Sequence, residues 1–70
     1  MGRVAAIGEA IRVQGLSLAG VLLLPAEGAD EVRASWRDLP TDVEVVILTP
    51  RAQAALGAQR TGPLVVVMPP

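Results

Sequence analysis

The sequence has no cysteine, histidine, lysine, tyrosine or phenylalanine, and Trp36 is its one aromatic residue. Without cysteine the chain has no disulfide and no thiolate ligands for zinc, which agrees with a cytoplasmic location. The missing residue types also remove the usual general bases, the thiol and amine nucleophiles and most transition-metal ligands. We therefore predict no catalytic residues, no metal site and no cofactor.

A strong charge of either sign is absent as well. Six arginines oppose seven acidic residues, and the arginines form no basic stripe, so nucleic acid is not an expected partner. The longest apolar stretch, 18–26, is interrupted by Gly20 and Pro25 and is far shorter than the roughly 20 residues that span a bilayer. We expect no direct insertion into a membrane.

The length of 70 residues predicts one domain, 1–70. A domain of this size buries only about 60% of the surface of its unfolded chain, so its stability is expected to be marginal. Help from a partner or from homo-oligomerisation is therefore expected.

Apolar runs alternate with helical patterns along the whole chain. The runs predict four strands, at Val4–Ile7, Val21–Leu24, Val43–Leu48 and Leu64–Met68. Between them lie three predicted helices, from Glu9 to Gly20, from Asp30 to Pro40 and from Arg51 to Arg60. This alternation predicts an α/β fold of the Rossmann or flavodoxin-like type, with a parallel sheet in the order 2-1-3-4 and flanking helices.

The first helix carries two apolar sides if it is a regular α-helix from Glu9 onward. One stripe is expected to face the sheet and consists of Ile11, Gly15, Leu18 and Ala19. In this interpretation Gly15 allows a close approach of helix and sheet, and Gly20 ends the helix with a positive φ. Val13 and Leu16 then point away from the sheet, where they could dock on a partner helix. The alternatives are a later start or a rotation of the helix, which would bury them, or a loop around Pro25 to Gly28 that covers them.

In the predicted order the second strand is added on one side of the first strand and the third strand on the other side. This reversal of strand order opens a crevice at the carboxyl ends of the first and third strands. The residues expected there are Gly8, Glu9, Thr49 and Arg51. Thr49 followed by Pro50 is a typical helix start. A small ligand could bind in this crevice, although the simpler explanation of Glu9 beside Arg51 is a helix-end charge balanced by a surface arginine. No glycine-rich phosphate-binding motif is present.

The stretch IGEAIRVQGLSLAGV resembles the opening of the F family of rotor subunits in archaeal and vacuolar-type rotary ATPases, which reads I-G-D, two or three residues, then T-V-x-G-F-x-L-A-G-V. The agreement lies at Ile7, Gly8, Glu9, Val13, Gly15, Leu18, Ala19, Gly20 and Val21. Ile11 and Arg12 replace the second acid and the threonine of the family, and Leu16 replaces its phenylalanine. The 70 residues lack the C-terminal helical tail of the family, so the resemblance is to a short form.

The resemblance implies the same α/β architecture and a non-catalytic role in the central rotor, or central stalk, of the ATPase. Members of the F family bind the coiled-coil rotor subunit, which belongs to the D family, in a complex that couples ATP to proton or sodium transport. They are cytoplasmic and peripheral to the membrane. The residues expected at that contact are Val13, Leu16, Glu9 and Arg12. Two other functions stay open, namely a homo-oligomeric scaffold or regulatory module and a small-ligand-binding domain that uses the crevice.

Overall fold

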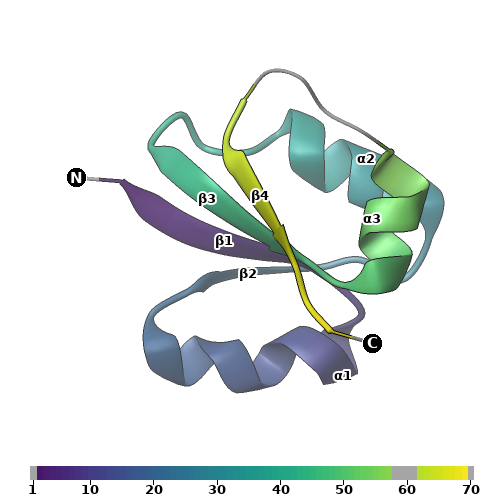
Figure 1. The fold of residues 1–70 in the computed structure, drawn as a ribbon, viewed down its shortest axis with the longest axis horizontal. Coiled ribbons are helices and arrows are strands. Elements are labelled where there is room, and N and C mark those ends of the chain that lie inside the picture. Colours follow the sequence, from purple (N-terminus) through teal and green to yellow (C-terminus); the bar gives the residue numbers. More distant parts are fainter. Residues whose placement is uncertain (1, 58–61, 70) are drawn as a thin grey trace.

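The protein is an α/β domain built on a four-stranded, all-parallel sheet in the order β2-β1-β3-β4 (Figure 1). The computed structural model describes residues 2–57 and 62–69. Its strands are β1 (Arg3–Gly8), β2 (Leu22–Pro25), β3 (Val43–Leu48) and β4 (Leu64–Val67). Its helices are α1 (Ala10–Val13), the 3₁₀ helix η1 (Gln14–Ala19), α2 (Ala29–Arg37) and α3 (Pro50–Leu56). The predicted fold class and strand order are confirmed.

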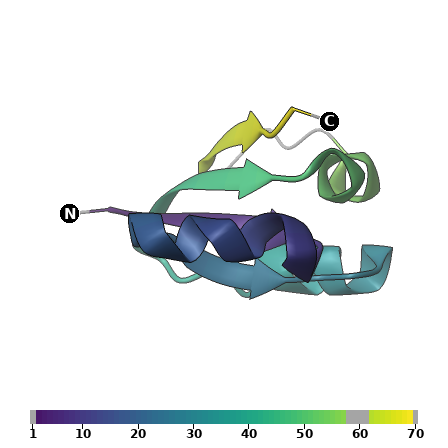
Figure 2. The same ribbon diagram turned by 90° about the horizontal axis from the view of Figure 1, so that it is seen from below.

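The helices cover the two faces of the sheet unequally. The α2 and α3 helices pack on one face and touch each other, whereas α1 and η1 lie on the opposite face against β1 and β2 (Figure 1). Figure 2 looks onto this second face and shows that β3 and β4 extend beyond the helix that covers β1 and β2. Half of one sheet face therefore has none of the described helices over it.

The main core lies between the sheet and the α2/α3 layer. Alternate residues of β1 and β3 point into it, and each is at most 1% exposed: Ala5, Ile7, Val46 and Leu48. Val32 of α2 and Ala52 of α3 close the core from the helix side. Trp36 is half-buried against this cluster, so it serves as a core residue.

The start of β1 is fixed by a charged contact. Arg3 donates to both carboxylate oxygens of Asp42, at 2.7 and 3.0 Å, and its backbone N–H donates to the Asp42 carbonyl. The guanidinium lowers the pKa of the Asp42 carboxyl, chiefly through this hydrogen bond. The contact lies beside an irregularity in the β1–β3 register, between Arg3 and Val4. The Arg3–Asp42 contact joins the turn before β3 to the first residue of β1.

The first helix is rotated relative to its prediction. Val13 is fully buried and Ile11 is 80% exposed, the reverse of the expected arrangement. The α-helical part ends at Val13, and the following 3₁₀ helix has about three residues per turn, which aligns Val13 with half-buried Leu16. Gly15 is exposed with open space around it, so the predicted close approach to the sheet is wrong. The side chains of Leu18 and Ala19, which completed the predicted stripe, lie outside the described residues.

Several element boundaries follow from single residues. Gly20 has a φ of 75° after η1, as predicted, and β3 has the predicted bounds. Thr49 caps α3 by accepting a hydrogen bond from the Ala52 N–H, and proline follows it. The α2 helix begins one residue before the predicted cap, because Gly28 rather than Asp30 occupies the N-cap position.

The third helix is shorter than predicted. It ends at Leu56 because Gly57 adopts a φ of 76°, which stops the helix and favours glycine. The remainder of the predicted helix, 58–60, lies outside the described residues. The edge strand β2 begins at Leu22, one residue later than predicted, and includes Pro25 as its last residue.

Candidate functional site

The predicted crevice residues meet where β1 and β3 end side by side. Thr49 follows β3 and is fully buried, and its hydroxyl donates to Glu9 Oε1 at 2.5 Å. Thr49 Oγ1 also accepts the Ala52 N–H at 3.3 Å. The Thr49 hydroxyl therefore uses its one proton and one of its lone pairs inside the protein, which suits a structural role.

Gly8 is required at this point for steric reasons. A Cβ atom on Gly8 would lie 2.3 Å from Thr49 Cγ2 and 2.5 Å from its Oγ1. The Gly8 carbonyl accepts the N–H of Ala26 at 2.8 Å, which ties the segment after β2 to the end of β1. The glycine thus lets the buried threonine fit between the ends of β1 and β3.

Glu9 has a lowered pKa, mainly because its carboxylate accepts the Thr49 hydroxyl hydrogen bond. The positive charges of Arg51 and Arg12 lower it further. A carboxyl group with a lowered pKa is ionised at neutral pH and is a weak base, so it is poorly suited to general acid–base catalysis. Its chemistry fits a fixed negative charge.

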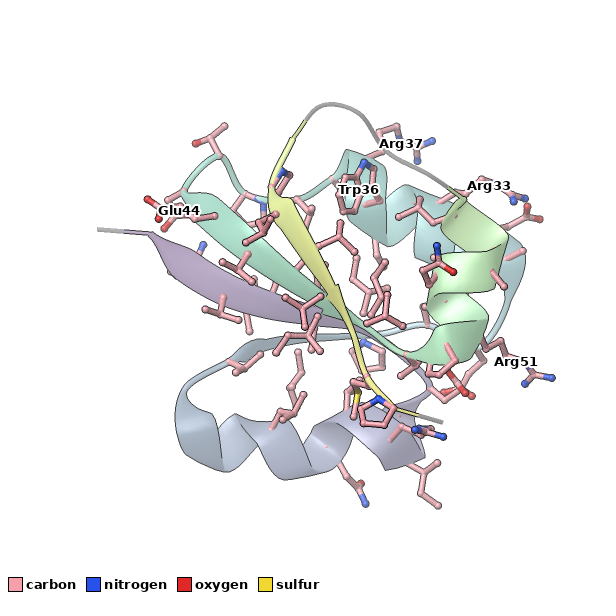
Figure 3. All side chains as sticks on the ribbon, viewed as in Figure 1. Arg33, Trp36, Arg37, Glu44 and Arg51 are labelled. Carbon is pink, nitrogen blue, oxygen red and sulfur yellow. The ribbon has the colours of Figure 1, made fainter. Side chains whose placement is uncertain are left out.

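Glu9 and Arg51 line one pocket of about 340 Å³. Its other walls come from the segment after β2 and from α2 and α3, with Glu27, Gly28 and five apolar residues: Ala26, Ala29, Val32, Ala52 and Ala55. Figure 3 shows that the Arg51 side chain extends outward from the first turn of α3, and it makes no ion pair with Glu9. The structure therefore places all four predicted crevice residues at the same end of the sheet, with Arg51 near Glu9 but not paired with it.

A second and wider hollow of about 580 Å³ lies at the opposite end of the sheet, where the sequence predicted no site. Trp36 and Glu44 line it, with residues of the turn before β3 and the two residues that precede β4 (Figure 3). The sequence did not predict this hollow because its walls come from two distant segments, 36–44 and 62–63, that carry no motif. Within 2–57 and 62–69, no group of three or more acidic residues is arranged to hold a metal ion.

The residues predicted to bind a partner do not form one surface. Val13 is in the interior, which corrects its predicted exposure. Glu9 is held by the buried threonine, and Arg12 Nη2 donates to the Pro69 carbonyl at 2.8 Å, which joins α1 to the end of β4. Leu16 is half-buried. Ile11, a large apolar residue of α1 that is exposed, is the one that the α-helical periodicity placed on the inner side.

No helix in the described part of the chain is both long and apolar enough to cross a membrane. Comparisons with protein-family models, with curated proteins and with solved structures find no match to this chain.

Proposed function

We propose that this chain is a non-catalytic binding protein and that, as its N-terminal resemblance implies, it belongs to the F family of rotor subunits in archaeal or vacuolar-type rotary ATPases. In this role it binds the coiled-coil subunit of the central rotor, peripheral to the membrane. The strand order 2-1-3-4 is the architecture that the resemblance implies. A fold alone does not determine a function, so the proposal depends on a surface.

The observation that carries the proposal is Ile11, an apolar side chain that is 80% exposed on α1. Ile11 lies within the stretch that resembles the family, at a position where the family has an acid and this chain has an apolar residue. A coiled coil offers apolar side chains that could cover it, and full burial of such a residue contributes about 2 kcal/mol. The neighbouring Arg12 is already fixed by Pro69, so α1 is held in place before a partner binds.

The test is co-expression with the coiled-coil rotor subunit encoded in the same genome, followed by light scattering on the purified complex. We expect a one-to-one complex, and we expect Ile11→Glu to weaken it by at least about tenfold, which corresponds to 1.4 kcal/mol. Ala54→Glu is the matched control, because it adds the same charge at an exposed position on α3, which lies on the opposite face of the sheet. Absence of a complex, or equal weakening by both variants, would refute the proposal.

A second candidate is a small-ligand-binding domain at the crevice, because Glu9 and Arg51 present opposite charges to one pocket. A ligand that carries both a cationic and an anionic group would match them. A thermal-shift screen of amino acids and other zwitterionic metabolites tests this function. Stabilisation that is lost in Glu9→Arg would support it, and no shift with any compound would count against it.

A further inference from the structure

The free edge of β4 has the properties of a strand that pairs with another strand. The Met68 N–H donates to the Leu48 carbonyl at 2.8 Å, so alternate residues of this strand direct their backbone groups toward β3. Val65 and Val67 must then direct their N–H and C=O groups outward, away from the sheet. Because β4 is the last strand in the order, none of the described strands pairs with them.

The side chains of β4 are also unusually apolar for an edge. Leu64 is 66% exposed, Val66 48% and Val67 44%, so apolar surface is open to solvent on both faces of the strand. Natural edge strands are normally protected by a charge, an internal proline or a covering segment, and 64–68 contains neither a charge nor a proline. The opposite edge strand β2 ends in Pro25, and η1 packs against it. The two edges of the sheet therefore differ in how well they are protected.

The apolar surface continues from β4 onto its neighbour. On the face that α1 only partly covers, Val66 pairs with Ile47, and Leu64 pairs with Val45. Ile47 and Val45 are half-buried, and Figure 2 shows none of the described helices over this part of the sheet. A partner that pairs with β4 would lie beside this surface.

We propose that the partner is a second copy of this chain and that two β4 strands pair antiparallel across a two-fold axis to form one continuous eight-stranded sheet. Antiparallel pairing is the arrangement that closes as a symmetric dimer, because each copy then presents the same edge to the other. A parallel pairing of the same two edges would need an offset of one residue along the strand, so an exact two-fold rotation could not relate the copies.

The prolines that flank β4 select the register. If Val66 faces Val66 of the other copy, Val65 and Val67 face each other and every outward N–H finds a carbonyl. A shift that centres the axis on Val65 places Pro63, which has no N–H, opposite Val67. The opposite shift places Pro69 opposite Val65, with the same loss. Only the register centred on Val66 satisfies all the outward groups of 64–68.

This contact extends beyond the proposed rotor function and uses a different surface. It is formed by the β4 backbone and the apolar residues beside it, whereas the coiled-coil contact is assigned to Ile11 on α1. A strand pair of this length buries less than the standard interface of about 800 Å² per partner, so the dimer is expected to be weak and dependent on concentration.

The first test is sedimentation velocity on the purified chain from about 1 µM to about 1 mM, the range in which weak interfaces dissociate. We expect a monomer–dimer equilibrium that Val66→Lys shifts at least tenfold toward the monomer. Ile11→Lys is the control and is expected to leave it unchanged, so a failure of the dimer and a failure of the rotor proposal remain distinguishable. Circular dichroism confirms that both variants are folded.

The second test is disulfide cross-linking, which the absence of cysteine makes unambiguous. In the predicted register the two copies of residue 66 form a non-hydrogen-bonded pair with Cα atoms about 4.5 Å apart, within the range of a disulfide. The two copies of residue 64 lie about 13 Å apart at 3.3 Å per residue. We expect Val66→Cys to cross-link at least tenfold faster than Leu64→Cys.

Three results would overturn the proposal. A chain that stays monomeric up to about 1 mM would leave the edge to another protein or segment. A dimer that Val66→Lys does not weaken would place the contact elsewhere. Cross-linking that is fastest at position 65 or 67 would refute the register.

Discussion

The substitution Gly8→Ala tests the packing at the crevice most directly. The added Cβ would lie 2.3 Å from Thr49 Cγ2 and 2.9 Å from Thr49 Cβ, closer than real side chains approach. Thr49 is fully buried, so it can relieve the overlap only by moving with its strand end or by rotating its side chain. Rotation would break its hydrogen bonds to Glu9 and to the Ala52 N–H.

The expected cost follows from these two consequences. Overpacking of a buried site costs about 1–3 kcal/mol, and loss of a helix cap costs about 1 kcal/mol. We therefore expect Gly8→Ala to lower the free energy of unfolding by about 2–4 kcal/mol. A 70-residue domain has a total stability of roughly 4–10 kcal/mol, so the variant should lose a large part of it.

Urea unfolding followed by circular dichroism measures the effect. Gly15→Ala is the matched control, because Gly15 has open space around it and lies in a helical segment, where alanine is expected to stabilise by about 0.5–1 kcal/mol. In a Thr49→Ala background the cost of Gly8→Ala should fall, since the two closest atoms are gone. A cost for Gly8→Ala below about 0.5 kcal/mol, the ordinary range of surface changes, would refute the steric argument, as would an equal cost in both backgrounds.

Three further predictions use the same unfolding measurement or a close relative of it. Val13→Ala should lower the free energy of unfolding by about 2 kcal/mol because it leaves a cavity at a buried site, while Ile11→Ser should change it by less than about 0.5 kcal/mol. A larger loss in Ile11→Ser than in Val13→Ala would show that Ile11, as predicted from the sequence, faces the core. The lowered pKa of Glu9 means that its stabilising interaction is complete above the unfolded-state pKa and is lost as the pH falls through the folded one. The free energy of unfolding should therefore decrease below about pH 5, and it should decrease less in Glu9→Gln than in the unmodified chain. The same pH dependence in both proteins would show that Glu9 is not the cause. Arg12→Ala removes the hydrogen bond to the Pro69 carbonyl and should speed amide exchange at the end of β4; unchanged exchange would show that this contact does not hold the strand end.

Much of the sheet could be predicted because its strands carry strong local signals. The run Val43–Leu48 is rich in β-branched residues and is followed by a threonine cap and a proline, and the structure has both features at the predicted residues. The strand order followed from the alternation of strands and helices. The crevice residues Gly8, Glu9 and Thr49 could be placed together for the same reason, since parallel strands end at one edge of the sheet.

The face of the first helix could not be predicted, because its period changes within the element. After Val13 the backbone tightens to a 3₁₀ helix, so a stripe computed at 3.6 residues per turn drifts away from the buried side. The steric role of Gly8 was also invisible in the sequence. It depends on Thr49, which lies forty-one residues later and comes close only when the sheet has formed.

The parallel sheet has a consequence for how quickly the chain folds. The central strand β1 pairs with β2 and with β3, and in the second pairing Ile7 is opposite Leu48. A two-stranded sheet is only marginally stable in water, so β1 and β2 gain little until the long segment before β3 has closed into a loop. Topologies dominated by such distant pairings fold slowly for their length. We expect refolding, followed by the fluorescence of Trp36, to be governed by this single loop closure.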